Sequence, residues 1–549
     1  MALENKHSGK HHRTEGVALR NASVAGVCCV VLPMLAGLSW FLSPAMRASA
    51  WRGALGDPQL MAALKVTLMS ALGSTVLALA LATAAIMLVY PSAPWVSLRK
   101  KLPALLAFPH AAFAIGVALL VAPTGWMARL LTTPFGWNAP PQWVTVQDAH
   151  GLTLMVALAI KESWFLLWML AATLGEKDVA HQMTLARSLG YGRMQAWWNV
   201  LLPQILPKIA WPLVAVLAYG LSVVDMALVL GPTTPPTLAV LTWQWLSDPN
   251  LQRVADGTIA TLLLAGLLSL CVVAAWLVWT GLRKIAVYPR GRRCPSRVSP
   301  TLQHATVVLV LALGVFPGAM LLLWSFASTW FFPAVLPANW TLANWVSADL
   351  RPLLTTFWLA TACVALLLPL TLVWLEWGPA RYSPLIYTPL LVPALPLAAA
   401  QYSVLVQLRL DGTAAGVIWS HLAWVLPYML ITLTGPYRAF DHRILTTARA
   451  LGYSRWLTCL TVKWPMLLRP IAASAAIGFS VSVAEYLPTL FAGAGRFQTV
   501  TTEAVALSAG GDRRILAVQS TLQMLLPLLA FALAVLIPQR GARAHRGMR

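Results

Sequence analysis

The stretch GTIATLLLAGLLSLCVVAAWLVWTG, residues 257–281, holds no charged side chain and is long enough to cross a bilayer as a helix. Runs of the same kind recur along the whole chain. They are continuous and rich in Leu, Ala and Val, and lipid offers the backbone no hydrogen-bond partner, so they are expected to be helices. The composition also indicates a membrane protein, because 59% of the 549 residues are hydrophobic and 10% are charged. Soluble proteins have roughly a quarter of their residues charged.

Twelve such runs are predicted as membrane spans, which makes the chain an all-α polytopic membrane protein with two pseudo-symmetric halves of six helices. The predicted spans are residues 22–42, 66–89, 102–122, 152–174, 209–230, 257–281, 305–326, 354–375, 386–407, 414–434, 471–491 and 516–537. The first run is followed by Ala48-Ser49-Ala50, which has the small residues of a signal-peptidase site. Because this run is longer than the apolar core of a signal peptide, it is predicted to remain as an uncleaved anchor.

The basic residues predict the orientation of the spans. An even number of spans puts both termini on one side, and placing that side in the cytoplasm leaves 28 of the 39 Lys and Arg residues inside, 10 outside and Lys161 within a span. This excess inside follows the positive-inside rule. The net charge of +22 therefore indicates orientation and attraction to anionic lipid rather than a nucleic-acid partner, because the basic residues are scattered between the apolar runs.

A twenty-residue segment occurs twice, at an offset of 262. The copies are TLARSLGYGRMQAWWNVLLP, residues 184–203, and TTARALGYSRWLTCLTVKWP, residues 446–465, and nine positions are identical. Both copies fall between the fourth and fifth predicted spans of their half, on the side expected to face the cytoplasm. Two amphipathic loops resting on lipid headgroups are the simpler alternative, but they do not explain why the same residues recur at the same place.

Each copy is predicted to form a helix, a turn and a second helix. Gly190 and Gly452 can adopt the left-handed conformation that ends a helix. A second amphipathic stretch begins at Arg193 and at Arg455. The residues predicted to form this paired element, which could bind a partner protein, are Thr184, Ala186, Arg187, Gly190, Arg193 and Pro203 in the first copy, and Thr446, Ala448, Arg449, Gly452, Arg455 and Pro465 in the second.

These segments resemble the EAA signature of binding-protein-dependent ABC permeases, in which Glu-Ala-Ala, three residues, Gly and nine residues precede an aliphatic residue, any residue and Leu-Pro. Gly190 and Val200, and likewise Gly452 and Val462, have that spacing. The initial Glu is absent, because Thr184 and Thr446 occupy its position. The resemblance implies that each loop docks into a cleft of a separate ATPase subunit, so that two ATPase copies and a periplasmic binding protein are the expected partners.

The resemblance extends over nearly the whole chain, which is similar to the fused permeases of the thiamine and ferric-iron importer group. The similarity looks closest to the YnjC-like permeases in the segments Phe108-Pro109-His110, Lys161-Glu162-Ser163, 231–240, Trp374-Leu375-Glu376-Trp377-Gly378 and 492–511. It implies a bacterial inner-membrane location. The domains expected are a basic cytoplasmic tail at 1–21, a permease domain at 22–281, a basic cytoplasmic linker at 282–304, a second permease domain at 305–538 and a basic cytoplasmic tail at 539–549.

Several motifs are absent from the sequence. There is no GxxxxGK[ST] phosphate-binding loop, so the partner ATPase is expected to use ATP while this chain binds no cofactor. No zinc-ligand spacing, no GxSxG motif and no disulfide framework are found, which leaves a membrane-embedded enzyme without a catalytic constellation. A secondary transporter driven by an ion gradient also has twelve spans in two halves, but it has no ATPase for the two loops to bind.

Ionisable side chains within spans are costly and are therefore functional candidates. The candidates for the translocation path are His110, Lys161, Glu162, Asp225 and Glu485. Asp225 and Glu485 follow the similar triplets Ser-Val-Val and Ser-Val-Ala, which predicts that they are equivalent in the two halves. As an acidic pair they would favour a cationic substrate. The alternative is that these groups fix helix packing, with His110 bonded to a carbonyl group.

Lys161 is predicted to form an ion pair with Asp225. Adjacent residues on a helix do not face each other, so Glu162 is a poor partner for Lys161. The spans that carry Lys161 and Asp225 are consecutive and antiparallel, and both residues are expected in the outer half of the membrane.

Overall fold

The computed structural model describes residues 2–174, 177–285 and 298–546, and within these ranges the regular structure is helical apart from one isolated bridge between Ala327 and Trp340. The helices before the linker are α1 Ala2–Phe41, α2 Ala48–Gly56, α3 Leu60–Val89, α4 Ala93–Ala107, α5 His110–Val121, α6 Trp126–Phe135, α7 Leu152–Leu174, α8 Lys177–Ser188, α9 Arg193–Ala196, α10 Leu202–Ile205, α11 Ala210–Ser222, α12 Asp225–Leu230, α13 Leu238–Leu246 and α14 Leu251–Ile285.

The helices after the linker follow the same order. They are α15 Pro300–Phe326, α16 Ala343–Ser347, α17 Arg351–Trp377, α18 Ser383–Ile386, α19 Thr388–Leu391, α20 Ala394–Gln407, α21 Ala414–Arg438, α22 His442–Ala450, α23 Arg455–Thr458, α24 Trp464–Met466, α25 Leu468–Ala484, α26 Leu487–Gly493, α27 Val500–Ser508 and α28 Arg513–Arg546. Most of the predicted linker, residues 286–297, lies outside the described residues.

The all-α polytopic fold predicted from the apolar runs is confirmed. Among the described residues, nine helices are long and apolar enough to cross a membrane, and the number rises to twelve when each of three bent helix pairs is taken as one span. The helices extend beyond the runs at both ends of the chain: α1 begins at Ala2 and α28 ends at Arg546. The predicted tails at 1–21 and 539–549 therefore continue the first and last spans as helix wherever they are described.

The predicted span 102–122 is wrong as a continuous helix. α4 ends at Ala107, Phe108 is extended with ψ of 116°, and α5 begins at His110. The cause is Pro109, because a proline disfavours helical backbone at the residue before it. The candidate span in this region is His110–Thr132 instead.

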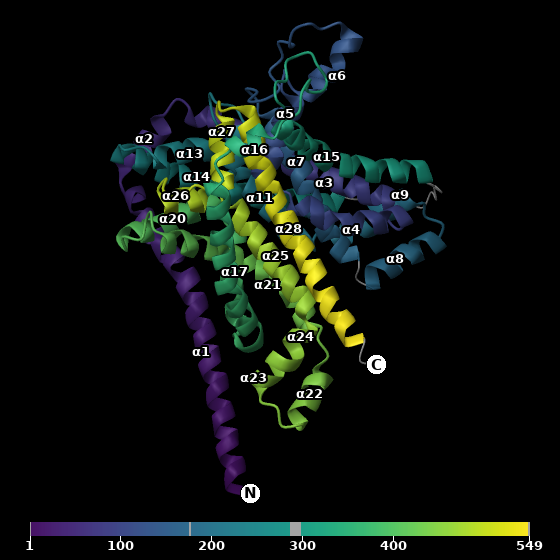
Figure 1. The fold of residues 1–549 in the computed structure, drawn as a ribbon, viewed down its shortest axis with the longest axis vertical. Helices are drawn as coiled ribbons and strands as arrows, with labels where there is room; N and C mark the ends of the chain where they lie inside the picture. Colours follow the sequence, from purple (N-terminus) through teal and green to yellow (C-terminus); the bar gives the residue numbers. More distant parts are fainter. Residues whose placement is uncertain (1, 175–176, 286–297, 547–549) are drawn as a thin grey trace.

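The first long helix of each half packs against the other half. α1 packs along α17 and α20 of the second half, and α15 packs along α3 and α5 of the first half as well as along α28 of its own. In Figure 1 the purple α1 runs beside the green helices of the second half, while α15 extends toward the helices of the first. Buried apolar residues from both halves form one continuous cluster, so the two halves share a single core.

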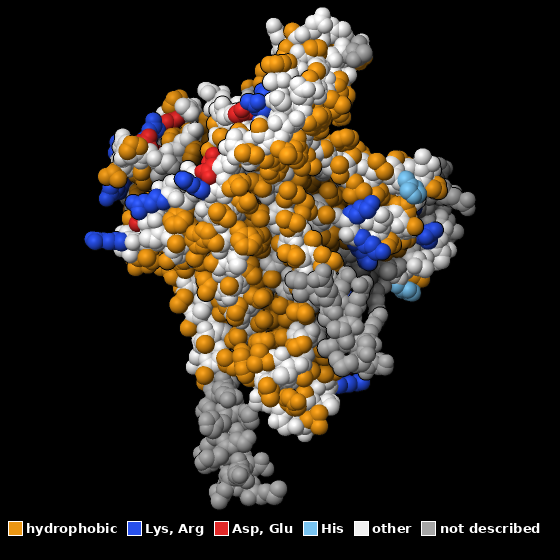
Figure 2. All heavy atoms as spheres, in the orientation of Figure 1, with side chains coloured by type: hydrophobic (Ala, Val, Ile, Leu, Met, Phe, Trp, Pro, Cys, Tyr) orange, Lys and Arg blue, Asp and Glu red, His pale blue; other side chains and the backbone are white. Residues whose placement is uncertain are grey.

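Close packing within the first half depends on small residues. α3 packs against α7 and α11, and the buried Ala71 and Ser74 of α3 lie beside Gly220 of α11, while Gly73 faces Met155 of α7. Such side chains let two helix backbones approach closely in a membrane. The face shown in Figure 2 is covered across its middle by hydrophobic side chains, with Lys and Arg gathered toward its edges, as expected for a protein surrounded by lipid.

Candidate functional site: two EAA-like loops and a charged membrane centre

The two EAA-like loops, residues 184–203 and 446–465, are built from the same succession of elements. In the first, α8 is followed by a turn at Gly190, by α9, by a π-helical turn and by α10. In the second, α22 is followed by a turn at Gly452, by α23, by a π-helical turn and by α24. The predicted helix, turn and second helix are confirmed in both halves. The π-helical turns had no signal in the sequence.

The turn at each glycine is a Schellman motif. Gly190 and Gly452 have φ of 85° and 91°. The Gly190 amide donates to the oxygen of Arg187 at 3.0 Å, and the Tyr191 amide donates to that of Ala186 at 3.1 Å. The matching bonds in the second loop measure 3.0 and 3.2 Å. These bonds satisfy the last carbonyl groups of the helix, and they need a positive φ that glycine adopts without strain.

One side of each loop helix is buried and the other is exposed. Ala186 and Ala448 are 4% and 7% exposed, so they face the rest of the protein. The other predicted residues of α8 and α22 are exposed, namely Thr184, Arg187, Thr446 and Arg449. Leu189 and Leu451, at the tips of the loops, are 57% and 75% exposed. Each loop thus presents polar side chains outward together with an exposed leucine at its tip.

Each loop leads through a sharp bend into the fifth span of its half. Pro203 and Pro465 lie two residues beyond the π-helical turns, inside the continuous helical runs 193–205 and 455–466, where each lacks the amide hydrogen of a helical bond. The chain then bends by 80° before α11 and by 81° before α25. Figure 1 shows the two loops far apart, with α8 and α9 at one side of the molecule and α22, α23 and α24 at its lower end.

The buried Lys161 does not form the predicted ion pair. Its Nζ atom donates to the main-chain oxygens of Leu105 and Leu106, at 3.3 and 3.4 Å. No ion pair joins Lys161 to Asp225, both of which are described. The prediction was wrong because it treated 102–122 as unbroken helix. The end of α4 leaves carbonyl groups without helical donors, and the Lys161 ammonium group satisfies two of them.

Glu162 instead pairs with His110. The Nε2 atom of His110 lies 3.1 Å from Oε1 of Glu162, and its ring centroid lies 4.7 Å from that of Tyr219. His110 is the first residue of α5, directly after the break at Pro109. The partner of His110 is therefore the carboxylate of Glu162, and not the carbonyl group that was the alternative from the sequence.

Asp225 and Glu485 lie at breaks in the predicted spans 209–230 and 471–491. Val223 is extended, with ψ of 127°, and Asp225 begins α12. α25 ends directly before Glu485, which is extended with ψ of 114°. The equivalence inferred from the Ser-Val triplets extends to the backbone, since each carboxylate follows the main helix of its fifth span.

Four of the five predicted path residues come together where the halves meet. The Asp225 carboxyl group lies within electrostatic range of the His110 ring and of the Glu485 carboxyl group. Tyr219 lies within electrostatic range of Glu162, Asp225 and Glu485. Lys161 is the exception, because its ammonium group is directed to the end of α4.

On the other side of the molecule from the α22–α24 loop, Arg129 joins the two halves. This α6 side chain is 2% exposed. Nη1 donates to the oxygens of Phe331 and Ala334, both at 2.7 Å, and Nη2 donates to that of Trp330 at 3.2 Å. The guanidinium group also lies 4.7 Å from the centroid of the Trp330 ring. In the sequence, Arg129 is the one Lys or Arg between the predicted spans 102–122 and 152–174, and nothing there connects it to partners some two hundred residues away.

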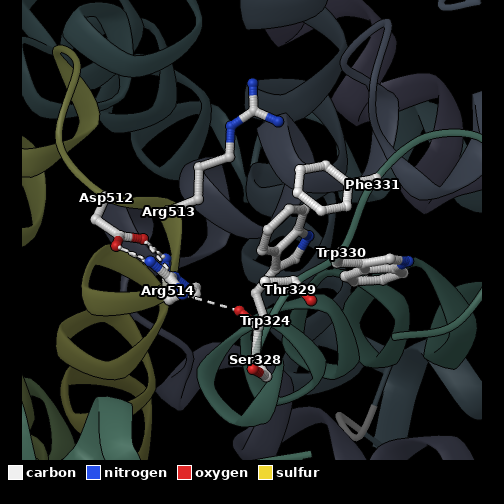
Figure 3. Close-up of a pocket in the computed structure, with 8 residues that line it drawn as sticks. All are labelled: Trp324, Ser328, Thr329, Trp330, Phe331, Asp512, Arg513 and Arg514. Atoms are coloured by element: carbon white, nitrogen blue, oxygen red, sulfur yellow. Dashed lines mark hydrogen bonds and ion pairs between the residues drawn. The ribbon is translucent and has the colours of Figure 1, made fainter. Parts of the chain in front are cut away.

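A pocket of about 280 Å³ lies beside this segment, between the end of α15 and the start of α28 (Figure 3). It is lined by Trp324, Ser328, Thr329, Trp330, Phe331, Asp512, Arg513 and Arg514. Arg514 donates to the oxygen of Ser328 at 2.8 Å and to Oδ2 of Asp512 at 2.7 Å. Asp512 holds the Arg514 side chain in place, while Arg513 donates to Thr124 at 2.7 Å. No group of three or more His, Cys, Asp or Glu side chains in the described chain is placed to hold a metal ion.

One buried acidic group near a loop was not among the predicted site residues. Glu376, next to the last residue of α17, contacts Arg455 and Lys463 of the second EAA-like loop. The sequence did carry one signal for Glu376, which is an acidic residue at the end of a predicted span and close to two tryptophans. Nothing in the sequence pairs it with residues some eighty positions later.

Comparison with known proteins identifies the family. No family model matches the chain. The chain is 40% identical over 526 residues to the inner membrane ABC transporter permease protein YnjC of Escherichia coli (strain K12), which covers 96% of this chain and 97% of that protein. It is 22% identical over 148 residues to the spermidine/putrescine transport system permease protein PotC of the same organism, which covers 26% of this chain and 56% of PotC. The chain therefore belongs to the ABC transporter permeases, as a multi-pass inner-membrane subunit of an importer.

Proposed function

We propose that this permease forms the translocation path between its two halves and couples it to two copies of a separate ATPase, one at each EAA-like loop. The observation that carries this proposal is the recurrence of one structure, a Schellman turn, a π-helical turn and a bend of about 80°, at the same place in both halves. Two copies of one rigid loop in a single chain are suited to bind two copies of one partner protein. The pseudo-symmetry of the halves then gives each ATPase copy its own loop.

The exposed surface of the loops supports the proposal. Leu189 and Leu451 are identical in the repeat and expose most of their apolar side chains, although leucine is normally buried. A leucine at the tip of a rigid turn is suited to a hydrophobic cleft on a partner. Hydrolysis of ATP belongs to that partner in this proposal, since this chain has no phosphate-binding loop.

The path runs past the charged group at the junction of the halves. His110 and Glu162 are in contact there, and Asp225 and Glu485 lie within electrostatic range of each other at breaks where the backbone is not helical. Irregular backbone within a membrane occurs where it lines a cavity or is enclosed by protein. With three carboxyl groups and one histidine, this region would favour a cation over an anion.

The orientation follows from the positive-inside rule, with both termini and both EAA-like loops in the cytoplasm. The opposite face, which carries Arg129 and the pocket in Figure 3, then faces the periplasm and a substrate-binding protein. The segment fixed by Arg129 gives that partner a surface to which both halves contribute.

Cross-linking tests the proposal directly. In a chain whose native cysteines are replaced by Ser, Leu189→Cys and Leu451→Cys should each cross-link to the ATPase, and the double variant should bind two ATPase copies. Ala343→Cys, exposed at the opposite face, is the control and should give no adduct with the ATPase. An adduct from Ala343→Cys alone would reverse the proposed orientation. If neither loop variant gives an adduct with the ATPase, the proposed coupling role is contradicted.

A further inference from the structure

Two short helices, α13 and α27, join the halves on the face proposed to be periplasmic, and they are called the outer helices below. Each packs against the second and sixth spans of its own half, namely α3 and α14 for α13, and α17 and α28 for α27. Each also contacts the third span of the other half, since α13 contacts α20 and α27 contacts α5. α27 further contacts α12, whose first residue is Asp225. In Figure 1 both outer helices lie in the upper part of the molecule, away from the α22–α24 loop.

The first amide of each outer helix is bonded to a buried threonine of the second span. The Leu238 amide donates to Oγ1 of Thr67 on α3 at 2.7 Å, and the Val500 amide donates to Oγ1 of Thr356 on α17 at 2.9 Å. All four residues are buried. The first amide of a helix has no acceptor within that helix, and a buried amide needs a partner. Each threonine therefore satisfies a group that the outer helix cannot satisfy by itself.

The two threonine hydroxyl groups are oriented to accept these bonds. Thr67 donates its hydroxyl hydrogen to the oxygen of Ala63 at 2.8 Å, and Thr356 donates to that of Pro352 at 2.7 Å. A hydroxyl group has one hydrogen and two lone pairs. Because the hydrogen is already engaged, each oxygen faces the outer helix as an acceptor, which is what an amide hydrogen requires.

The fold duplicates this bond although the sequence does not reveal it. Thr237 and Thr499, which cap the outer helices, lie 262 positions apart, the same offset as the EAA-like loops. Thr67 and Thr356 are related by a different offset, so their equivalence becomes visible only when the helices are placed in space. A bond that both halves form at the same place in the fold points to a shared role.

We propose that Thr67 and Thr356 are positioning residues that hold the outer helices across the junction of the halves while the path is closed on that side, and that both bonds break when the path opens there. The proposal rests on the path proposed above and adds the two residues that keep it closed. Each bond joins neutral groups, so it breaks without leaving a buried charge. The freed Leu238 and Val500 amides then bond water that enters the open path.

Distances between spin labels test the proposal without a known substrate. In the chain whose native cysteines are replaced by Ser, the labels are attached at Gln244→Cys on α13 and Ala506→Cys on α27, which are exposed positions. The full complex with its ATPase and binding protein, in lipid nanodiscs, is measured without nucleotide and with ATP and vanadate. We expect a narrow distance distribution without nucleotide. With ATP and vanadate the distance should increase by roughly 2 Å or more, the size of helix shifts at interfaces.

Valine variants remove the hydroxyl groups and nearly keep the size of the side chains. Without nucleotide, Thr67→Val and Thr356→Val should each move the distance by roughly 2 Å toward its value with ATP and vanadate. That latter value should stay unaltered, because the bonds are already broken in that state. Thr67→Ser and Thr356→Ser keep the hydroxyl group and should behave as the unmodified chain.

Matched controls lie on the same two helices. Thr83→Val on α3 and Thr361→Val on α17 should change neither distance, since these hydroxyl groups donate to carbonyl oxygens of their own helices. If Thr67→Val fails to accumulate because the Leu238 amide is left buried and unpaired, Thr67→Ala takes its place. The smaller side chain leaves room for a water at that amide, and the expected shift is the same.

The outcomes separate this inference from the function on which it rests. An unaltered nucleotide-free distance in both valine variants would overturn the role of the threonines, and so would serine variants that shift as far as the valine variants. A shift of equal size in both states would assign the threonines to packing alone and would also overturn it. No response to ATP and vanadate in a chain that binds no ATPase would instead refute the coupling role. In that case the contrast between valine and serine variants, measured without nucleotide, still decides whether the threonines hold the outer helices.

Discussion

Gly190 and Gly452, which lie 262 positions apart, end their helices in the same left-handed conformation, with φ of 85° and 91°. Around Gly452 no atom lies within 4 Å of the place where a Cβ would be, so the space itself would admit a larger side chain. The requirement for glycine is therefore one of backbone conformation. Each loop depends on it in the same way.

Replacement of either glycine by valine should weaken coupling while leaving the protein in the membrane. A β-branched residue in this conformation costs roughly 1–2 kcal/mol, and the change lies outside the apolar spans. We expect normal membrane abundance in Gly190→Val and Gly452→Val, with reduced co-purification of the ATPase and reduced uptake. Gly266→Val in α14 is the control, since Gly266 is helical and has open space around it. Normal association and uptake in both loop variants would contradict the assignment.

Reporter fusions should place the linker and the C-terminus in the cytoplasm. Fusions after Arg293 and after Arg540 are expected to be active with a cytoplasmic reporter and inactive with an exported one, because the basic residues on that side resist translocation. A fusion in the outside loop after Val144 should give the opposite pattern. Export of the linker reporter would show that the count of six spans before it is wrong.

A double-mutant cycle should show that Lys161 and Asp225 act independently. Lys161 satisfies carbonyl groups at the end of α4, so the effects of Lys161→Ala and Asp225→Ala on thermal stability should add within about 0.5 kcal/mol. The contacting pair His110 and Glu162 provides the comparison. Here the cycle should give an interaction energy of roughly 0.5–3 kcal/mol. A strong coupling between Lys161 and Asp225 would restore the ion pair expected from the sequence.

Removal of Arg129 should loosen the contact between the halves at the proposed periplasmic face. Arg129→Ala leaves the oxygens of Trp330, Phe331 and Ala334 without their donor, which should lower the free energy of unfolding by roughly 3 kcal/mol. The measurement is thermal denaturation in detergent, with proteolysis of the 327–342 segment as a second readout. Arg52→Ala, at an exposed arginine, should change neither. Equal stability of both variants would show that the contact contributes little.

Hydropathy was sufficient to predict the helices of this protein but not where they break. Runs of twenty apolar residues predict a span whether or not its middle is helical, so the extended residues Val223 and Glu485 were not foreseen. Pro109 carried a signal for a break, and the unbroken reading of 102–122 led directly to the wrong partner for Lys161. The turns at Gly190 and Gly452 were predictable because they depend on local backbone alone.

The contacts that the sequence did not reveal are those between distant segments. Arg129 and Glu376 are each surrounded by groups from other elements, and neither spacing nor composition connects them to those groups. His110 and Glu162 were predicted as separate candidates for the path, and only the fold brings them into contact. Side chains whose role depends on tertiary position are thus the ones that one sequence leaves unassigned.

The exchange of first helices between the halves has a consequence for biogenesis. α1 leaves the ribosome long before α17 and α20, the helices along which it packs. Its buried face therefore stays against lipid or a chaperone until α20, the third span of the second half, has been inserted. α15 meets α3 and α5 as soon as it enters the membrane, because they are already present. Joining the halves in one polypeptide keeps α1 close to the helices that it will contact and favours pairing within one copy over pairing with a half from another.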